Sequence, residues 1–124
     1  MKTDVVIVGC GVAGLYAALN LPREKQILII TKSDRKSSDS FLAQGGICVL
    51  RDEKDYESFF QDTLNAGHYA NNRESVEIMI RSSRGIIEEL MSWGVEFEQK
   101  DGELLYTREG AHSRNRILYH EDIT

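Results

Sequence analysis

A glycine-rich turn between two apolar stretches constrains the fold of this chain most. The first stretch covers residues 4–8, a helical pattern follows at 12–21, and a second apolar stretch covers 26–31. The turn has the spacing GxGxxG, and its glycines are Gly9, Gly11 and Gly14. Both stretches are rich in β-branched residues and do not alternate with polar ones, which is typical of parallel strands buried on both faces. The sequence therefore predicts the start of a strand–helix–strand unit in an α/β fold.

Each glycine of the turn has a separate physical task if the turn binds a dinucleotide. Gly9 permits the tight turn, Gly11 lets the backbone approach a pyrophosphate, and Gly14 lets the helix pack closely on the strand. The helix N-terminus then offers free N–H groups and a positive dipole to the phosphates. A chance glycine turn is the alternative, but the order of strand, turn, helix and strand favours dinucleotide binding.

The end of the second strand departs from the pattern for NAD. NAD sites usually place an acidic side chain there, which accepts a hydrogen bond from a ribose hydroxyl. This chain has Thr31-Lys32-Ser33, and Asp34 comes slightly late. A lysine cannot accept a hydrogen bond, so a standard NAD site is disfavoured. Ser33 or Asp34 could replace the missing acceptor, and an NAD(P)-binding unit stays open at this point.

The rest of the chain predicts a loop, helices and a hairpin. Residues 32–42 are polar and are expected to form a loop, and 47–50 are expected to form a short strand. Helical spacing of apolar residues predicts one helix from residue 56, with Asp55 as its N-cap, and a longer helix at 73–93 that ends at Gly94. Asp101-Gly102 predicts a hairpin turn between strands at 95–98 and 104–107.

Several side chains are expected to be structural. Met79, Met91 and Trp93 are expected in the core, because they recur at helical spacing. Cys10 is expected to contribute only its backbone, and Cys48, which has no histidine partner in sequence, is expected to be buried. A doubly wound sheet usually has about five or more strands, and only two are evident here. The sequence is therefore expected to stop within a larger domain.

The composition of the chain limits the kinds of partner that it is expected to bind. The chain has 15 Lys and Arg against 20 Asp and Glu, a net charge of −5, and its basic residues are scattered. Nucleic-acid binding is therefore not expected. Its 2 cysteines lie far apart, which argues against a disulfide framework or a metal site. Residues 5–21 are too short and glycine-rich for a membrane span, and no signal-peptide pattern is present. We expect a cytoplasmic protein without a membrane partner.

Three further segments carry a resemblance to a known family. They are Thr31-Lys32, then Ser40-Phe41-Leu42-Ala43-Gln44-Gly45-Gly46, and finally residues 107–118, which read Thr-Arg-Glu-Gly-Ala-His-Ser-Arg-Asn-Arg-Ile-Leu and precede His120 and Asp122. Together with the glycine turn, they resemble the fumarate reductase/succinate dehydrogenase flavoprotein family over essentially the whole chain. The resemblance implies the N-terminal part of a Rossmann-like FAD-binding domain over 1–124, a parallel sheet with helices, which runs into the start of an α+β capping domain at about 95–124.

The resemblance implies FAD as the cofactor. The pyrophosphate would lie along 10–14, the adenosine ribose beside Lys32 and Ser33, and the path towards the isoalloxazine ring along 39–46. The expected cofactor-binding residues are Gly9, Cys10, Gly11, Val12, Ala13, Gly14, Lys32, Ser33, Asp39, Ser40, Phe41, Leu42, Ala43, Gln44, Gly45 and Gly46. Succinate dehydrogenases have a histidine at the position of Asp39 and link it covalently to FAD, so FAD is expected to be non-covalent here.

Within the family, the similarity is greatest to members that oxidise L-aspartate to iminoaspartate, the first step of de novo NAD biosynthesis. This implies that Glu109 faces the α-ammonium group of the substrate; the alternative is an exposed carboxylate paired with Arg108. Oxygen or fumarate would accept the electrons, and the next enzyme of quinolinate synthesis is a candidate partner. The family's acid/base arginine lies further along the chain, so no catalytic residue is expected in this span, and the span is expected to be inactive alone.

Alternatives and open positions remain. The chain could instead belong to a fumarate reductase or succinate dehydrogenase flavoprotein, or to a non-catalytic dinucleotide-binding module. Ala111 replaces a glycine of the family, which would cost about 1 kcal/mol if the position needs a positive φ. The sequence assigns no role to four residues of the C-terminal segment. Two of them, Arg114 and Arg116, could neutralise substrate carboxylates or FAD phosphates, or they could be solvated. The four are His112, Arg114, Arg116 and His120.

Overall fold

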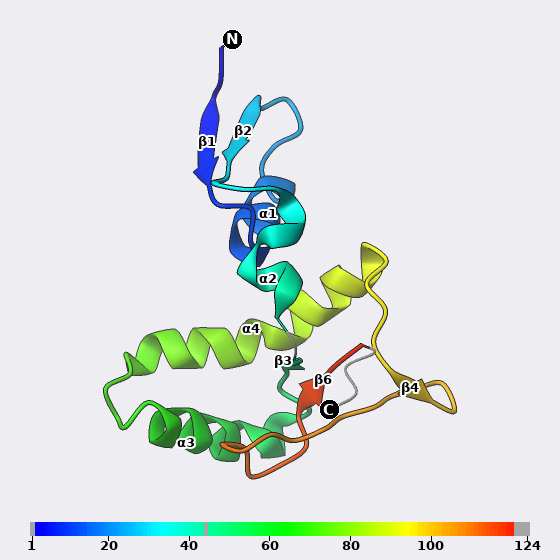
Figure 1. The fold of residues 1–124 in the computed structure, drawn as a ribbon. Coiled ribbons are helices and arrows are strands. Elements are labelled where there is room, and N and C mark those ends of the chain that lie inside the picture. The colour runs from blue at the N-terminus through cyan, green and yellow to red at the C-terminus, as the bar shows by residue number, and fades with distance from the viewer. Residues whose placement is uncertain (1, 44, 121–124) are drawn as a thin grey trace. The chain divides into compact units, whose positions relative to one another are not determined.

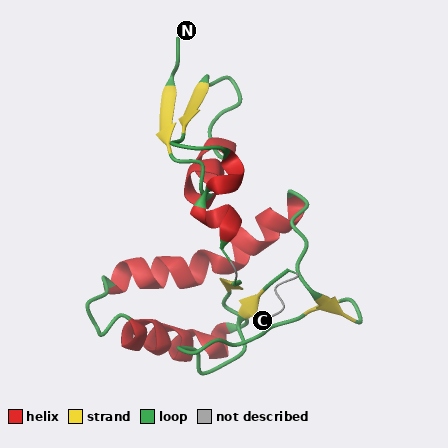
Figure 2. Ribbon diagram, in the orientation of Figure 1, coloured by secondary structure: helices red, strands yellow, loops and turns green. Residues whose placement is uncertain are grey.

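The computed structural model describes residues 2–43 and 45–120. The chain forms two compact units, Met1–Gln44 and Gly45–Thr124. Figure 1 labels their elements, and Figure 2 distinguishes helices from strands. None of the helices in the described part of the chain is long and apolar enough to cross a membrane.

The first unit contains the predicted strand–helix–strand arrangement. Strands β1 (Val5–Val8) and β2 (Ile27–Ile30) are parallel and pair in register from Val5 with Ile27 to Val8 with Ile30, and helix α1 (Val12–Leu19) connects them. The helix ends two residues before the predicted boundary. The side chain of Asn20 donates to the carbonyl of Tyr16 at 3.0 Å, and Leu21 N donates to Ala18 O at 3.3 Å, so the last turn tightens before Pro22.

The segment after β2 is not simply a loop, so this prediction is wrong in part. It contains a 3-10 turn η1 (Arg35–Ser37) and a short helix α2 (Asp39–Leu42). Asp34 accepts a hydrogen bond from Lys36 N at 2.8 Å, and Ser38 accepts one from Phe41 N at 3.3 Å. The polar side chains that suggested a loop therefore act as N-caps of two short helical turns.

The second unit is built on two helices that lie side by side (Figure 1). Helix α3 (Tyr56–Ala66) follows a 3-10 turn η2 (Glu53–Asp55), and α4 (Arg73–Ser92) is the longest helix among the described residues. Gly94 follows α4 with a φ of +92°, as the sequence predicts for a helix end.

Two pairs of short strands complete the described part of the second unit. Strand β3 (Ile47–Cys48) pairs antiparallel with β6 (Ile117–Leu118) and is shorter than the predicted 47–50. Strands β4 (Gln99–Lys100) and β5 (Glu103–Leu104) form the hairpin. Asp101 and Gly102 have φ values of +55° and +83°, which is the conformation of a type I′ turn. The turn prediction is confirmed, but the paired residues lie closer to it than predicted.

Two apolar clusters form the core of the second unit. The first contains Leu50, Phe59, Phe60, Leu64, Val76 and Ile80, and the second contains Val49, Ile87 and Leu118. Helix α4 contributes to both. The core prediction for Met79, Met91 and Trp93 is wrong, because these side chains are 49%, 39% and 43% exposed. Met79 lies beside the buried line of α4 and borders a cavity, whereas Met91 and Trp93 lie at the end of the helix, beyond Ile87.

Candidate functional site

A cavity of about 570 Å³ opens where β1 and β2 end. The carboxyl ends of parallel strands are the usual place for ligands in α/β sheets. The glycine turn, the residues after β2 and the start of α2 border this cavity, all within the first unit. The predicted cofactor-binding residues that line it are Gly9, Cys10, Gly11, Lys32, Ser33, Asp39 and Ser40.

The glycine turn has the geometry that the sequence predicts. Gly9 has a φ of +106°, a backbone conformation that residues other than glycine rarely adopt. A Cβ on Gly14 would collide with the carbonyl oxygen of Gly9 and lie 3.2 Å from Ile7 Cγ2. A Cβ on Gly11 would lie 3.0 Å from Ser40 Oγ. Helix α1 therefore lies as close to β1 as the backbone allows, and its N-terminus opens towards the cavity.

Ser40 contacts the N-terminus of α1 from helix α2. Its Oγ accepts a hydrogen bond from Val12 N at 3.0 Å. A hydroxyl that accepts a hydrogen bond keeps its own proton for donation, and the first N–H groups of a helix have no partner within the helix. The Ser40 hydroxyl, which lines the cavity, and the N–H groups of the first turn of α1, which starts directly after the lining residue Gly11, thus form a set of donors. These donors fit a pyrophosphate group.

Cys10 has a structural contact that the sequence did not suggest. Its side chain is 8% exposed, and its Sγ donates to Thr31 Oγ1 at 3.3 Å. The expectation that only its backbone contributes is therefore wrong. The contact joins the residues that follow β1 and β2, so it fixes the two sides of the cavity relative to each other.

The other predicted cofactor residues do not line this cavity; Val12, Ala13 and Gly14 follow its lining residue Gly11 in the first turn of α1. Phe41, Leu42 and Ala43 are exposed in the first unit, and Gln44 lies outside the described residues. Gly45 and Gly46 belong to the second unit. A Cβ on Gly46 would collide with Leu118 O and Ile117 Cγ2, so the lack of a side chain at Gly46 is required by its packing on β6.

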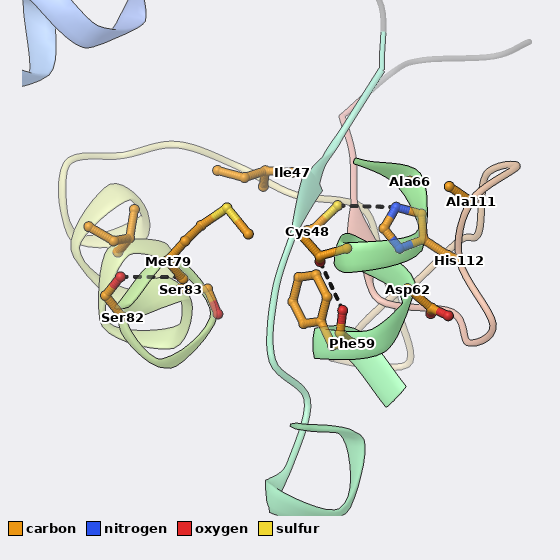
Figure 3. Close-up of a pocket in the computed structure, with 12 residues that line it drawn as sticks. Ile47, Cys48, Phe59, Asp62, Ala66, Met79, Ser82, Ser83, Ala111 and His112 are labelled. Carbon is orange, nitrogen blue, oxygen red and sulfur yellow. Dashed lines mark hydrogen bonds between the residues drawn. The ribbon is translucent and has the colours of Figure 1, made fainter. Parts of the chain in front are cut away.

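A second cavity, of about 460 Å³, lies within the unit Gly45–Thr124 (Figure 3). Side chains of β3, α3 and α4 line it together with the segment that contains Ala111 and His112. In Figure 3 the imidazole of His112 points towards Cys48, and their Nε2 and Sγ atoms lie 3.5 Å apart. Cys48 is only partly buried, and its histidine neighbour lies 64 positions away in the sequence. Burial raises the pKa of the Cys48 thiol, the charge of Arg116 lowers it in part, and Glu109 raises it further.

Arg116 lies at the centre of a buried network of charges. Its side chain has no exposed surface, and its Nε and Nη2 donate to Asp55 Oδ2 and Oδ1 at 3.2 and 2.8 Å. Its Nη1 donates to Asp62 Oδ2 at 2.6 Å, and its Nη2 also donates to Ser58 Oγ at 3.1 Å. Burial raises the pKa of both carboxyl groups, but the hydrogen bonds and the charge of Arg116 outweigh it, so both pKa values are lowered.

The network corrects the prediction for Asp55. Asp55 stands at the N-cap position of α3 as predicted, but its side chain makes no cap hydrogen bond. Asp52 caps the preceding turn η2, because its Oδ1 accepts from Asp55 N at 3.0 Å. The Asp55 side chain turns inward to Arg116 instead. No local sequence signal indicates this pairing, since 61 positions separate the two residues.

Asp62 also holds the segment that contains Glu109. Ser113 N and Oγ both donate to Asp62 Oδ2 at 2.7 Å, and His112 N donates to Glu109 O at 3.1 Å. Ala111 does not have a positive φ, so the condition under which it would cost stability is not met. His120 is exposed, and Asp122 lies outside the described residues.

The carboxylate of Glu109 lies beside Gly45. A Cβ built on Gly45, whose φ is +133°, would be 3.9 Å from Glu109 Oε1. The ion pairs among the described residues do not include one between Glu109 and Arg108. Glu109 therefore lies next to the Gly45-Gly46 segment without the arginine pairing that the alternative interpretation required.

Fold and site together define an FAD-binding domain, and residues 4–123 match the family model described as FAD binding domain. The chain belongs to this family, which confirms the predicted fold class and FAD as the cofactor. It is 49% identical over 121 residues to the L-aspartate oxidase of Clostridium perfringens strain 13, covering 98% of this chain and 28% of that protein. It is 46% identical over 125 residues to the L-aspartate oxidase of Clostridium acetobutylicum, covering 100% of this chain and 29% of that protein.

A solved structure has the same fold. Mycobacterium smegmatis Sdh1 in complex with UQ1 superposes with a TM-score of 0.88 at 27% identity, covering 98% of this chain and 21% of that one. The resemblance to the fumarate reductase/succinate dehydrogenase flavoproteins is thereby confirmed. The chain spans about 28% of the length of the curated relative from Clostridium perfringens.

Proposed function

We propose that the whole protein to which this chain corresponds oxidises L-aspartate to iminoaspartate with FAD, the first step of de novo NAD biosynthesis. The observation that carries the proposal is the carboxylate of Glu109, which lies beside Gly45 and is not paired with Arg108. The identity of 49% to an L-aspartate oxidase, against 27% to Sdh1, supports the same choice.

The first unit would hold the cofactor without a covalent bond. The N–H groups of the first turn of α1 and the hydroxyl of Ser40 would bind the pyrophosphate. Lys32 and Ser33 would lie beside the adenosine ribose, and Asp39 stands where a histidine would be needed for covalent attachment. Bound there, FAD would supply the two-electron oxidation. The further residues that we assign to the cofactor are Gly9, Cys10, Gly11, Gly14, Phe41, Leu42, Ala43, Gln44, Gly45 and Gly46.

Glu109 would select the substrate. L-Aspartate differs from succinate by an α-ammonium group, and a carboxylate beside that group favours the amino acid over the plain dicarboxylate. We assign no proton transfer to residues of this span. Oxygen or fumarate would reoxidise the cofactor, and the next enzyme of quinolinate synthesis would consume the product in the cytoplasm.

The main alternative is a fumarate reductase or succinate dehydrogenase flavoprotein. In that case Glu109 would face a substrate without an ammonium group, and an acidic side chain there would repel both carboxylates. A non-catalytic dinucleotide-binding module would bind FAD but oxidise neither compound.

Steady-state kinetics of the full-length flavoprotein test the proposal. We expect oxidation of L-aspartate and a KM that rises about tenfold or more in Glu109→Gln, because a hydrogen bond to a charged group contributes about 1.5–3 kcal/mol. Inhibition by succinate should become no weaker, because the variant removes a charge that repels its carboxylates. The matched control is Glu103→Gln, an exposed glutamate of the hairpin. Faster oxidation of succinate than of L-aspartate by the unaltered protein would overturn the proposal.

A further inference from the structure

The two ring nitrogens of His112 have different neighbours. Nδ1 lies 3.2 Å from Arg116 Nη1, and Nε2 lies 3.5 Å from Cys48 Sγ. A guanidinium group has only hydrogen-bond donors, so Nδ1 must accept the bond from Arg116. The hydrogen of the neutral imidazole then lies on Nε2.

Arg116 cannot turn away from this contact without leaving other groups unpaired. Its five N–H groups all have acceptors: Nε and one Nη2 hydrogen bond to Asp55, the other Nη2 hydrogen to Ser58, and the two Nη1 hydrogens to Asp62 and His112. The Arg116 Cζ also lies 4.7 Å from the centre of the Phe59 ring. The position of Nη1 is therefore determined by two carboxylates and a hydroxyl that lie on or just before α3.

His112 also lines the 460 Å³ cavity, and its Nε2 is directed to Cys48, which lines the same cavity (Figure 3). The neighbour of Nε2 there is Cys48 Sγ at 3.5 Å, and a thiol sulfur accepts hydrogen bonds weakly. A carboxylate oxygen is a much stronger acceptor for an N–H group than a thiol sulfur. The Nε2–H group thus has capacity for a better partner than the one it has.

We propose that Arg116 is a positioning residue, which holds His112 in the Nε2–H tautomer so that the ring offers a hydrogen-bond donor to a carboxylate at the edge of this cavity. His112 would then bind a carboxylate of the substrate and would not accept a proton at Nε2. The inference rests on the proposed function only in naming the substrate carboxylate as the acceptor. The tautomer itself follows from the network and does not depend on the reaction.

The tautomer can be measured directly in the full-length flavoprotein labelled with ¹⁵N-histidine. Long-range ¹H–¹⁵N NMR shows which ring nitrogen carries the hydrogen, and His112→Gln identifies the signal by its loss. We expect Nε2–H in the unaltered protein and a mixture of tautomers in Arg116→Lys, which lacks the second donor arm. Arg114→Lys is the matched control, since this arginine is exposed in the same segment, and it should leave the signal unchanged. An Nδ1–H tautomer in the unaltered protein overturns the proposal even if Arg116→Lys fails to fold.

Steady-state kinetics of His112 variants distinguish a hydrogen-bond donor from a general base at this position. Gln has an amide N–H group in place of Nε2–H, so His112→Gln should keep the KM for L-aspartate close to that of the unaltered protein. His112→Leu should raise this KM about tenfold or more with little change in kcat. Equal effects of the two variants on KM, or a loss confined to kcat, would overturn the role of His112 as a donor. If the protein oxidises no L-aspartate, the proposed function fails, but the NMR measurement still decides the tautomer.

Discussion

Arg116 and Asp55 form a two-fold hydrogen-bonded ion pair, although 61 positions separate them in the chain. Nε donates to Oδ2 at 3.2 Å and Nη2 donates to Oδ1 at 2.8 Å. The pair joins the residue before β6 to the turn before α3. Arg116 has no exposed surface. Its buried positive charge is therefore stabilised by the carboxylate of Asp55 in place of water, and the carboxylate is stabilised by Arg116.

Removal of the guanidinium should destabilise the protein strongly. Arg116→Leu leaves the carboxylates of Asp55 and Asp62 without their cation, and breaking a buried pair in this way costs about 3–5 kcal/mol. Arg114→Leu is the control, since this side chain is 53% exposed and lies 3.8 Å from Asp55, and it should cost about 0–1 kcal/mol. The apparent free energy of unfolding in urea measures both. Similar values for the two variants would contradict a central role of the network.

The network should also make stability depend on pH in the acid range. Burial raises the pKa of Asp62, but hydrogen bonds from Ser113 and Arg116 outweigh it, so the folded-state pKa lies below the unfolded value of about 3.9. Asp62 therefore contributes stability above pH 3.9 or so, and this contribution is lost as the pH falls through the folded-state pKa. Asp62→Asn should flatten the fall in unfolding free energy below about pH 4. Glu88→Gln, on the exposed side of α4, should not. Parallel curves for Asp62→Asn and the unaltered protein would contradict the prediction.

Gly14→Ala should weaken FAD binding. The new Cβ would collide with the carbonyl of Gly9, so α1 must move away from β1, at a cost of about 1–3 kcal/mol. Because α1 provides the donors beside the cavity, we expect the Kd for FAD to rise about tenfold. Gly85→Ala is the matched control, since nothing lies within 4 Å of its Cβ. It should stabilise α4 by about 0.4–1 kcal/mol without changing the Kd. Fluorescence titration and urea unfolding measure the two effects, and an unchanged Kd in Gly14→Ala would count against the assignment of this turn.

Ala111→Gly should destabilise the protein rather than relieve strain. Ala111 does not have a positive φ, so glycine adds only conformational freedom to the unfolded chain, which costs about 0.5–1 kcal/mol. Thermal unfolding of the full-length protein is the measurement. A higher Tm in the variant would mean that this position favours glycine.

Local sequence patterns predicted the elements that local interactions determine. The strand–helix–strand unit follows from the glycine turn and the apolar stretches, and the turn at Asp101-Gly102 and the end of α4 at Gly94 follow from backbone preferences of single residues. The two short helical turns after β2 were missed, because four or fewer residues show no helical periodicity. Ser38 was the available signal, as a serine that caps a helix N-terminus.

The charged network could not be predicted from local patterns. The sequence predicts Asp55 as a cap, and only the position of Arg116 in the folded chain decides that the Asp55 side chain turns inward. The contact between Cys48 and His112 joins residues 64 positions apart for the same reason. Met79 was misassigned because helical spacing marks an apolar stripe without showing which edge of the stripe borders a cavity.

Helix α4 contributes Val76 and Ile80 to one apolar cluster and Ile87 to the other. A helix of 20 residues is about 30 Å long and resists bending as a continuous rod. A loss of packing at either cluster is therefore transmitted along one backbone to the other. We therefore expect the two clusters to open together, so that the amide protons of the buried stretch of α4 would exchange with solvent at similar slow rates.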